Sequence, residues 1–291
     1  LLHWFHANHR ILPFRSDPTP YHVWLSEIML QQTRVSAALP YYERFLAALP
    51  DIPALAACEE EKLHKLWEGL GYYSRVRNLQ KAAKLVCAQY GGELPADYDA
   101  LRALPGIGDY TAGAIASISF GLAVPAVDGN VLRVMARLRE DGEDILKQSV
   151  KNRVEAELTE IMPAEDPGAF NQAMMDLGAM VCLPNGAPKC EVCPLFDQCL
   201  AGQHQTWTEY PFKKSAKPRR IEDRTVLLFL DGTHTAVRKR PKKGLLAGLY
   251  EFPNFDGVLS EQEALEEAGI HHATLEFENE KGTCKMECCA D

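Results

Sequence analysis

The sequence contains no apolar run long enough to span a membrane, although 46% of its 291 residues are hydrophobic. It also has no basic and then apolar N-terminal segment of the kind that directs secretion. We therefore expect a cytoplasmic protein without a membrane partner, associated with the nucleoid if its source is bacterial. The chain starts at Leu1 rather than at a methionine, so an extension of the native chain beyond residues 1 and 291 is left open.

The sequence is also short of positive charge. It has 31 lysines and arginines against 40 aspartates and glutamates, and its formal net charge is −9. This balance argues against a broad basic surface, which supplies most of the non-specific affinity of proteins for nucleic acid. Only residues 201–220 are basic, with five basic side chains and one acidic one. Any DNA contact elsewhere is expected from backbone amides or from local side chains such as Arg75 and Arg77.

Alternating strand patterns are missing from residues 1–200, which instead show helical periodicity with glycine and proline at the breaks. The length favours two domains, and this first part is predicted to be mostly α with a core of its own. Residues 201–220 lose the periodicity and gain charge, as an exposed linker does. We therefore expect a helical domain at 1–200, a linker at 201–220 and a second domain at 221–291.

The second domain differs in pattern from the first. Two β-prone runs flank Asp231-Gly232, a dipeptide typical of a hairpin turn. An extended stretch and a helix follow them, which predicts the start of an α+β domain. The predicted strands, extended stretch and helix cover residues 224–230, 234–240, 248–255 and 260–268.

Nine cysteines are unevenly distributed, and four of them lie in one loop with the spacing C-x7-C-x2-C-x5-C. Four thiols so close together in a cytoplasmic protein favour a metal site over disulfides, because that compartment keeps thiols reduced. A single compact loop after a predicted helix at 170–181 favours a [4Fe-4S] cluster over structural zinc, which usually has two separated CxxC knuckles. Zinc stays the alternative, and Cys58 and Cys87 are expected to be core residues. The four candidate ligands are Cys182, Cys190, Cys193 and Cys199.

The segment LPGIG at 104–108 lies between two predicted helices, one at 97–103 and one from 109 onward. Its proline ends the first helix. Gly106 and Gly108 allow a tight turn whose backbone N–H groups face outward beside the N-terminus of the next helix. Such a turn binds phosphate without charged side chains. An ordinary helix–helix turn is the alternative, but the cysteine loop one helical domain later favours DNA binding.

Glu27 is a candidate general acid. It lies in a segment, 21–39, that we predict to be helical, and most of its neighbours three and four positions away are apolar. A carboxyl group on an apolar face should have a raised pKa and stay protonated near neutral pH, as a general acid must. A helix carboxylate or a core salt bridge is the alternative for Glu27 taken alone.

Asp128 begins another predicted helix in the tripeptide Asp128-Gly129-Asn130. An N-cap is the simplest role for an aspartate at this position. That role is compatible with catalysis, because an ionised carboxylate held by helix amides can stabilise an oxocarbenium-like sugar cation. Glu27 and Asp128 are therefore a candidate pair of carboxyl groups for hydrolysis of a glycosidic bond.

Together these features resemble the helix-hairpin-helix DNA glycosylase superfamily and, within it, the MutY-type adenine DNA glycosylases. The resemblance covers most of the chain and implies a monomer that binds double-stranded DNA with an adenine mispair. It implies two helical subdomains with DNA in the cleft between them. One would hold the middle helices and the hairpin, and the other the N-terminal helix and the [4Fe-4S] loop at 182–199. The segments that carry it are WLSEIMLQQTRV (24–35), LWEGLGYYSRVRNL (66–79), LPGIGDYTAGAI (104–115), AVDGNVLRVMARL (126–138), FNQAMMDLGAMVC (170–182) and the cysteine loop.

The resemblance also implies a mechanism. Glu27 would protonate N7 of an adenine flipped out of the duplex, and Asp128 would stabilise the sugar cation, with a possible transient bond to it, before water attacks C1′. Gln32 and Tyr72 would enter the duplex beside the opposing base. The other matches are Tyr110 and Asn130 lining the nucleotide pocket, Gln172 reading the adenine edge, and Phe14 with Arg15 forming the pocket wall. Simple packing or solvent exposure is the alternative for Tyr72, Phe14 and Gln172.

Tyr110 and Glu27 distinguish between branches of the superfamily. Endonuclease III-like glycosylase/lyases have a lysine at the position of Tyr110, which forms a Schiff base, and usually a glutamine at the position of Glu27. The resemblance therefore implies a monofunctional glycosylase that removes adenine opposite 8-oxoguanine or guanine in base excision repair. A glycosylase/lyase for oxidised pyrimidines and a non-catalytic iron-sulfur DNA-binding protein are the alternatives.

The C-terminal segment resembles the start of a Nudix-like domain, which in this family recognises 8-oxoguanine. LLAGLYEFP (245–253) matches its beginning, but the chain ends in KGTCKMECCAD (281–291) where the oxoguanine-reading loop is expected. The domain is therefore predicted to be truncated. Asn254 and Gln262 stand where the Nudix box needs Glu and Arg, so a working nucleotide pyrophosphatase is not expected. The positions that do match the box are Gly248, Glu263, Glu266, Glu267 and Gly269.

Overall fold

The computed structural model describes residues 1–215, 218–241, 244 and 246–269. The chain divides into two compact units, Leu1–Ser215 and Ala216–Asp291. Residues 201–215, which the sequence assigns to a linker, belong to the first unit. They are held there by Glu140, whose carboxylate accepts a hydrogen bond from the Thr206 hydroxyl and lies 3.1 Å from the His204 ring nitrogen.

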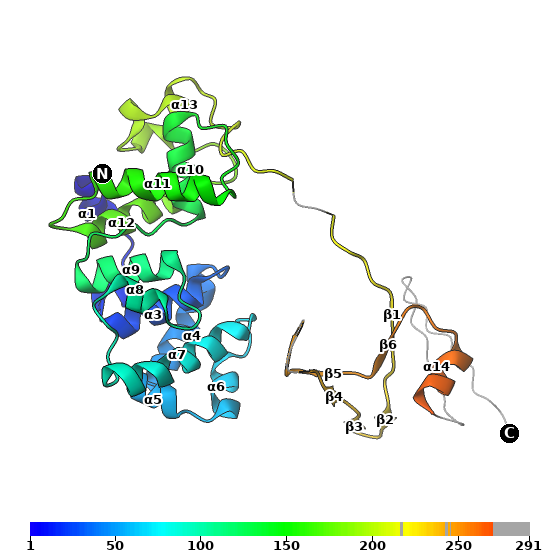
Figure 1. Ribbon diagram of the computed structural model, residues 1–291. Helices are drawn as coiled ribbons and strands as arrows, with labels where there is room; N and C mark the ends of the chain where they lie inside the picture. The colour runs from blue at the N-terminus through cyan, green and yellow to red at the C-terminus, as the bar shows by residue number, and fades with distance from the viewer. Residues whose placement is uncertain (216–217, 242–243, 245, 270–291) are drawn as a thin grey trace. The chain divides into compact units, whose positions relative to one another are not determined.

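The first unit is helical, as the sequence predicts (Figure 1). No helix in the described residues is long and apolar enough to cross a membrane. Short 3-10 turns, η2 (Cys190–Val192) and η3 (Phe196–Gln198), and a π-helical turn, η1 (Leu177–Val181), interrupt the α-helices near the cysteine loop. The α-helices are α1 (Leu2–Asn8), α2 (Pro13–Ser16), α3 (Pro20–Leu30), α4 (Val35–Ala48), α5 (Ile52–Ala57), α6 (Glu60–Trp67), α7 (Ser74–Tyr90), α8 (Tyr98–Arg102), α9 (Asp109–Phe120), α10 (Gly129–Arg139), α11 (Gln148–Ile161), α12 (Pro167–Asp176) and α13 (Leu200–Gln203).

Two main hydrophobic cores divide the helices into two groups. The larger core is built from α2 to α9 around the fully buried Trp24, Phe45 and Trp67. The other is built mainly from α10, α11, α12 and η1, and α1 packs against α12. In Figure 1 the first group is blue to cyan-green. The second group is mostly green, apart from α1, which is dark blue. This arrangement agrees with the expected two helical subdomains, the second of which joins the N-terminal helix to the cysteine loop.

Several helices begin at a side chain that accepts hydrogen bonds from the free backbone N–H groups of the first turn. Asp97 caps α8 and accepts a hydrogen bond from the backbone N–H of Ala100. Asp166 caps α12 and accepts one from that of Ala169. Asp128 caps α10 in the same way, as the sequence predicts. The caps of α10 and α12 fix the starts of two helices that line the cavity described below.

The helix predicted over 21–39 is wrong in its extent, because it breaks after Leu30. α3 ends there, Gln32 has a φ of +57°, and α4 begins only at Val35. The physical reason is a buried side chain from α7. The Arg75 guanidinium donates hydrogen bonds to the last carbonyls of α3 and so terminates the helix.

The turn between α8 and α9 needs a glycine at one of the two expected positions. Gly106 has a φ of +81°, and a Cβ there would lie 2.8 Å from the Cβ of Asn78. Gly108 has ordinary extended backbone with a φ of −99°, and a Cβ there would meet open space. The expectation that both glycines provide conformational freedom is therefore correct only for Gly106.

The second unit contains strands and one helix in its described residues. The strands form three antiparallel pairs, β1 with β6, β2 with β3 and β4 with β5. The predicted hairpin is present, but Asp231 pairs with His234 as a strand residue, so Gly232 and the following residue form the turn. Residues 281–291 lie outside the described residues. The elements are β1 (Arg224–Val226), β2 (Leu230–Asp231), β3 (His234–Thr235), β4 (Arg238–Lys239), β5 (Tyr250–Glu251), β6 (Asn254–Asp256) and α14 (Glu261–Ala268).

The predicted helix at 260–268 corresponds to α14. Ser260 caps it and forms a capping box with Glu263, whose carboxylate accepts hydrogen bonds from the backbone N–H and the hydroxyl of Ser260. Glu263 is one of the residues that match the Nudix box. In this structure Glu263 stabilises the start of α14, so its presence is explained without a nucleotide-binding role.

Candidate functional site

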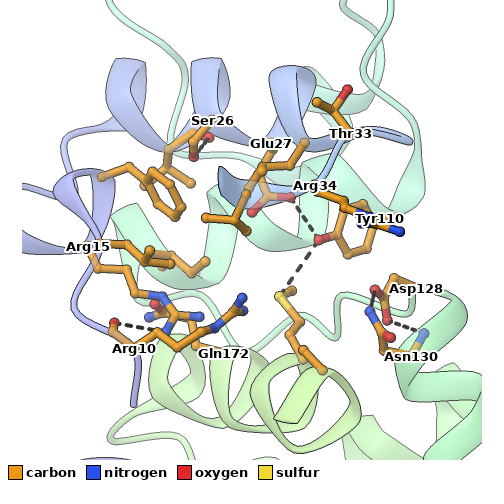
Figure 2. A pocket seen from close by; sticks show the side chains of 18 residues that line it. Arg10, Arg15, Ser26, Glu27, Thr33, Arg34, Tyr110, Asp128, Asn130 and Gln172 are labelled. Atoms are coloured by element: carbon orange, nitrogen blue, oxygen red, sulfur yellow. Dashed lines mark hydrogen bonds between the residues drawn. The ribbon is translucent and has the colours of Figure 1, made fainter. Parts of the chain in front are cut away.

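A cavity of about 400 Å³ lies in the first unit (Figure 2). One side of its wall comes from α2, α3 and α9, and the other from α10, α12 and η1, so residues of both subdomains line it. Seven of the residues selected from the sequence meet here, although they are spread over more than 150 positions. They are Phe14, Arg15, Glu27, Tyr110, Asp128, Asn130 and Gln172.

Glu27 points into this cavity from α3 and is only 8% exposed. The Tyr110 hydroxyl donates a hydrogen bond of 2.7 Å to Glu27 Oε2. The pKa of Glu27 is raised to about 7, mainly by burial and also by the negative charge of Asp128, while Tyr110 and Arg15 oppose the rise. The prediction of a raised pKa is thus confirmed, and near neutral pH this carboxyl group exists in both protonation states.

Asp128 faces the same cavity from the N-terminus of α10. Its Oδ1 accepts hydrogen bonds of 2.8 Å from the backbone N–H groups of Asn130 and Val131, and its Oδ2 accepts one of 2.7 Å from Asn130 Nδ2. Burial raises the pKa of Asp128 above its ordinary value, and these hydrogen bonds together with the charge of Arg133 limit the rise. The carboxylate is therefore fixed in orientation, with donors that favour its ionised form.

Arg15 is held at the cavity wall by a residue that the sequence did not single out. Asp176, at the end of α12, is completely buried, and its Oδ2 accepts a 2.6 Å hydrogen bond from Arg15. Arg10, another lining residue, donates to Asp176 Oδ1 through Nε at 2.9 Å and through a terminal nitrogen at 2.5 Å. The Asp176 carboxylate thus accepts hydrogen bonds from two guanidinium groups. These groups hold the pKa of Asp176 below its usual value.

Phe14 lines the cavity beside Arg15 from α2, and Gln172 lines it from α12. Phe14 is 9% exposed and packs edge to face against Tyr42, with ring centroids 5.7 Å apart. Gln172 Nε2 makes a 3.3 Å hydrogen bond to the carbonyl of Gly168, one turn earlier in α12. These contacts give Phe14 a packing role and leave the Gln172 carbonyl oxygen available to a ligand within the cavity.

The chain is similar to known proteins in both sequence and structure. The family model of the HhH-GPD superfamily of base excision DNA repair proteins matches residues 25–163. The adenine DNA glycosylase of Buchnera aphidicola subsp. Schizaphis graminum is 35% identical over 93% of this chain and 78% of that protein. The chain belongs to the adenine DNA glycosylase family. It is therefore a base excision repair DNA glycosylase, as the sequence predicts.

Other relatives agree with this family. The human adenine DNA glycosylase is 36% identical to this glycosylase over 90% of the chain and 58% of the human protein. A solved thermostable thymine-DNA glycosylase has a TM-score of 0.62 and 26% identity, covering 70% of this chain and 93% of that one. Endonuclease III in a non-covalent DNA complex has a TM-score of 0.58 and 27% identity, covering 70% and 92%. The helix-hairpin-helix glycosylase fold is thereby shown, and DNA is its class of substrate.

Gln32 and Tyr72 lie outside the cavity lining of this glycosylase. Both side chains are exposed, Tyr72 at 63%, and both residues have positive φ angles, +57° and +47°. The expectation that Arg75 contacts DNA is wrong, because its side chain is turned inward and only 9% exposed. Arg77 is half-buried.

The four cysteines of the loop surround a second, small cavity of about 30 Å³. Arg137 donates a 3.3 Å hydrogen bond to Cys182 Sγ. Four thiols around one space, in a loop closed by short turns, are the donor set that a [4Fe-4S] cluster needs, and the residues therefore fit that cluster. Within the described residues, no group of three or more His, Cys, Asp or Glu side chains has the arrangement that holds a single metal ion.

Two further residues of this glycosylase connect the cavity to the cysteine loop. Arg133 donates to Asn130 Oδ1 at 2.9 Å and to the Cys182 carbonyl at 2.9 Å, so it joins the partner of Asp128 to the first cysteine. Gly178 lies against Asn130, and a Cβ there would be 2.6 Å from the Asn130 Cβ. Neither residue could be identified from the sequence, because the spacing of residues does not show which parts of η1 and α10 contact each other.

Proposed function

We propose that this glycosylase is a monofunctional enzyme that hydrolyses the N-glycosidic bond of adenine opposite 8-oxoguanine or guanine in double-stranded DNA. The observation that carries the proposal is the pairing of Glu27 and Asp128 in one cavity, the first with a pKa near 7 and the second fixed by helix amides. Such a pair of carboxyl groups with different protonation states is what acid-assisted cleavage of a glycosidic bond requires.

In the first step the proton of Glu27 moves to N7 of an extruded adenine. The bond between N9 and C1′ then breaks, and its electron pair leaves with the neutral adenine base. The hydrogen bond from Tyr110 holds one oxygen of Glu27 in place, which directs the other oxygen toward the base. Arg15, Phe14 and Gln172 supply the wall against which adenine would lie.

In the second step the deoxyribose carries a positive charge that the Asp128 carboxylate stabilises. Asn130 keeps the Asp128 carboxylate oriented through its side-chain and backbone donors. Water adds to C1′, and its proton returns to Glu27, which restores the starting state. A transient bond between Asp128 and C1′ is compatible with the same geometry and gives the same product.

The absence of a Schiff base follows from the cavity lining. Tyr110 occupies the position where glycosylase/lyases have a lysine, and no lysine lines the cavity within the described residues. A primary amine is needed to attack C1′ and to start elimination of the 3′ phosphate. The product is therefore expected to be an intact strand with an abasic site.

The remaining parts serve the binding of DNA in this proposal. Gly106 and Gly108 present backbone amides to a phosphate beside α9, and Gln32 and Tyr72 fill the space that adenine leaves. The four cysteines hold a [4Fe-4S] cluster, which orders the loop for contact with the DNA backbone and takes no part in the chemistry. The second unit is a Nudix-like mispair-recognition domain, and the protein acts as a monomer in the cytoplasm.

The proposal is tested by single-turnover excision from duplexes that differ only in one base pair. We expect excision of adenine opposite 8-oxoguanine and opposite guanine, and no release of an oxidised pyrimidine. The variants Glu27→Gln and Asp128→Asn are expected to lower the adenine rate by at least about 100-fold, since both groups act in the transition state. Near-parental rates in either variant, or activity only on oxidised pyrimidines, would contradict the proposal.

A further inference from the structure

Arg75 makes an unusual set of contacts for a buried arginine. It lies in the first turn of α7, and its two terminal nitrogens donate hydrogen bonds to five backbone carbonyls. One nitrogen bonds to the carbonyls at the end of α3, at 2.9, 3.0 and 2.7 Å. The other bonds to two carbonyls of the turn before α7, at 3.1 and 3.3 Å. The acceptors of the first nitrogen are Ile28, Met29 and Gln31, and those of the second are Leu70 and Gly71.

Each of the two segments that Arg75 holds is followed by an exposed residue with left-handed backbone. Gln32 comes directly after the Gln31 acceptor and has a φ of +57°, and Tyr72 comes directly after the Gly71 acceptor and has a φ of +47°. Residues with a Cβ adopt this conformation only where their surroundings impose it. The Arg75 guanidinium also lies 5.6 Å from the centre of the Tyr72 ring.

We propose that Arg75 is a positioning residue that holds Gln32 and Tyr72, the wedge pair, in the arrangement in which they enter the DNA duplex when the adenine is extruded. This inference rests on the proposed function, because the wedge role of Gln32 and Tyr72 belongs to it. Arg75 acts on base extrusion and not on the proton transfer or the cleavage of the glycosidic bond.

The geometry favours a guanidinium over other side chains at this position. Its planar fork carries donors on two separate nitrogens, so one side chain bonds to two chain segments in a fixed relative position. A lysine carries its three donors on one nitrogen, so it lacks the fixed separation between two sets of donors that a guanidinium provides. Trp67 adds a second bond to the turn, since its ring N–H donates to the Gly71 carbonyl at 3.0 Å, and the Arg75 guanidinium lies 5.3 Å from the centre of the Trp67 ring.

The exposed surface of Arg75 is too small for a direct role in binding phosphate, and the cavity lining does not include it. α3 nevertheless carries both Glu27 and the carbonyls that Arg75 binds, so a change at Arg75 could also displace the acid. The test must therefore separate extrusion from chemistry. Extrusion is measured by the fluorescence of 2-aminopurine, which rises when this adenine analogue leaves the base stack.

The experiment uses the full chain with Glu27→Gln, which we expect to bind DNA without releasing the base, and a duplex with 2-aminopurine opposite 8-oxoguanine. We expect a fluorescence rise with Glu27→Gln alone and a rise at least about tenfold smaller when Arg75→Lys or Arg75→Gln is added. Excision by the single variants Arg75→Lys and Arg75→Gln should fall by a similar factor, and the pH dependence of the remaining rate should not change. Lys81→Gln, which removes an exposed charge from the same helix, should leave both readouts unchanged.

A double-mutant cycle distinguishes the wedge from a general loss of structure. In a chain that already carries Gln32→Ala and Tyr72→Ala, adding Arg75→Lys should change excision by less than about threefold, because its effect passes through these two residues. The proposal is overturned if Arg75→Lys lowers the excision rate by the same factor with and without the Gln32→Ala and Tyr72→Ala changes. It is also overturned if the fluorescence rise is unchanged, if the pH dependence shifts, or if neither Arg75 variant folds. If the parent releases no adenine and Glu27→Gln gives no fluorescence rise, the proposed function fails instead.

Discussion

Glu27 is a carboxyl group that the fold keeps away from water at a cost in stability. Its pKa is about 7 in the folded protein against an ordinary value of 4.5, so the folded state binds more protons than the unfolded state between these values. The free energy of unfolding therefore falls as the pH rises through this window. A neutral isostere that accepts the same hydrogen bond from Tyr110 does not carry this penalty.

Glu27→Gln is accordingly expected to be inactive and more stable. The gain in the free energy of unfolding should be larger at pH 8 than at pH 5.5 by about 2 kcal/mol, from 1.5 pH units inside the window. Thermal or denaturant unfolding of both proteins at the two pH values measures this difference. An equal gain in the free energy of unfolding at both pH values would show that burial does not raise the pKa of Glu27.

Tyr110 tunes the same group in the opposite direction. Its hydroxyl donates to Glu27 and lowers the pKa of that carboxyl, because the hydrogen bond favours the charged form. Tyr110→Phe should therefore raise the pKa of Glu27 and move the alkaline limit of the single-turnover rate to higher pH. The pH–rate profiles of the two proteins provide the measurement, and a shift to lower pH would contradict the assignment of Glu27 as the acid.

Individual residues could be predicted from the sequence where the chemistry is local. The apolar face of Glu27 and the N-cap position of Asp128 both follow from neighbours within four positions. Asp176 could not be found in this way, because its partners Arg10 and Arg15 are more than 160 positions away. Arg75 was misjudged because a charged residue was assumed to face solvent, whereas five backbone carbonyls accept hydrogen bonds from its terminal nitrogens inside the protein.

At the scale of the helices, α10 is the element that positions the Asp128 carboxylate in the cavity. Its first turn contains Asp128 and Asn130, and η1 packs so closely that only a glycine fits at position 178. Gly178→Ala should push Asn130 away and disturb the orientation of Asp128, with a loss of about tenfold or more in single-turnover rate. The matched control is Gly129→Ala, where a Cβ meets open space and a much smaller effect is expected.

The helical character of residues 1–200 followed from periodicity, and so did the helices predicted at 97–103, 170–181 and 260–268, whereas the break between α3 and α4 did not. The sequence of residues 31–34 contains neither glycine nor proline, which are the usual signs of a break. A side chain from α7 imposes the break by binding the carbonyls of α3. Tertiary contacts of this kind have no local signature, and the exposed residues that they position are therefore the least predictable part of the site.

At the scale of the whole molecule, the cysteine loop packs against the same helix, α10, that carries Asp128. Arg133 and Arg137 of this helix bond to the main chain or thiol of Cys182. Loss of one cysteine should therefore loosen the loop and lower DNA affinity by at least about tenfold. The pH dependence of excision should not change, because no cluster ligand touches Glu27.

Cys193→Ser tests this expectation through DNA binding, the pH–rate profile and the content of iron and acid-labile sulfide in the purified protein. We expect four iron atoms per parent chain, since the four thiolates match a [4Fe-4S] cluster. Stoichiometric zinc in place of iron would contradict the cluster. An altered pH profile in Cys193→Ser would contradict its separation from the chemistry.

The central claim is that this family member hydrolyses a glycosidic bond with two carboxyl groups and leaves the DNA strand intact. Its most direct test is single-turnover reaction on a duplex with adenine opposite 8-oxoguanine, with half of each sample treated with alkali before electrophoresis. The account predicts free adenine at once and strand breaks only after alkali, which cleaves the abasic site. Strand breaks without alkali, formed at the same rate as free base, would contradict it and indicate a lyase.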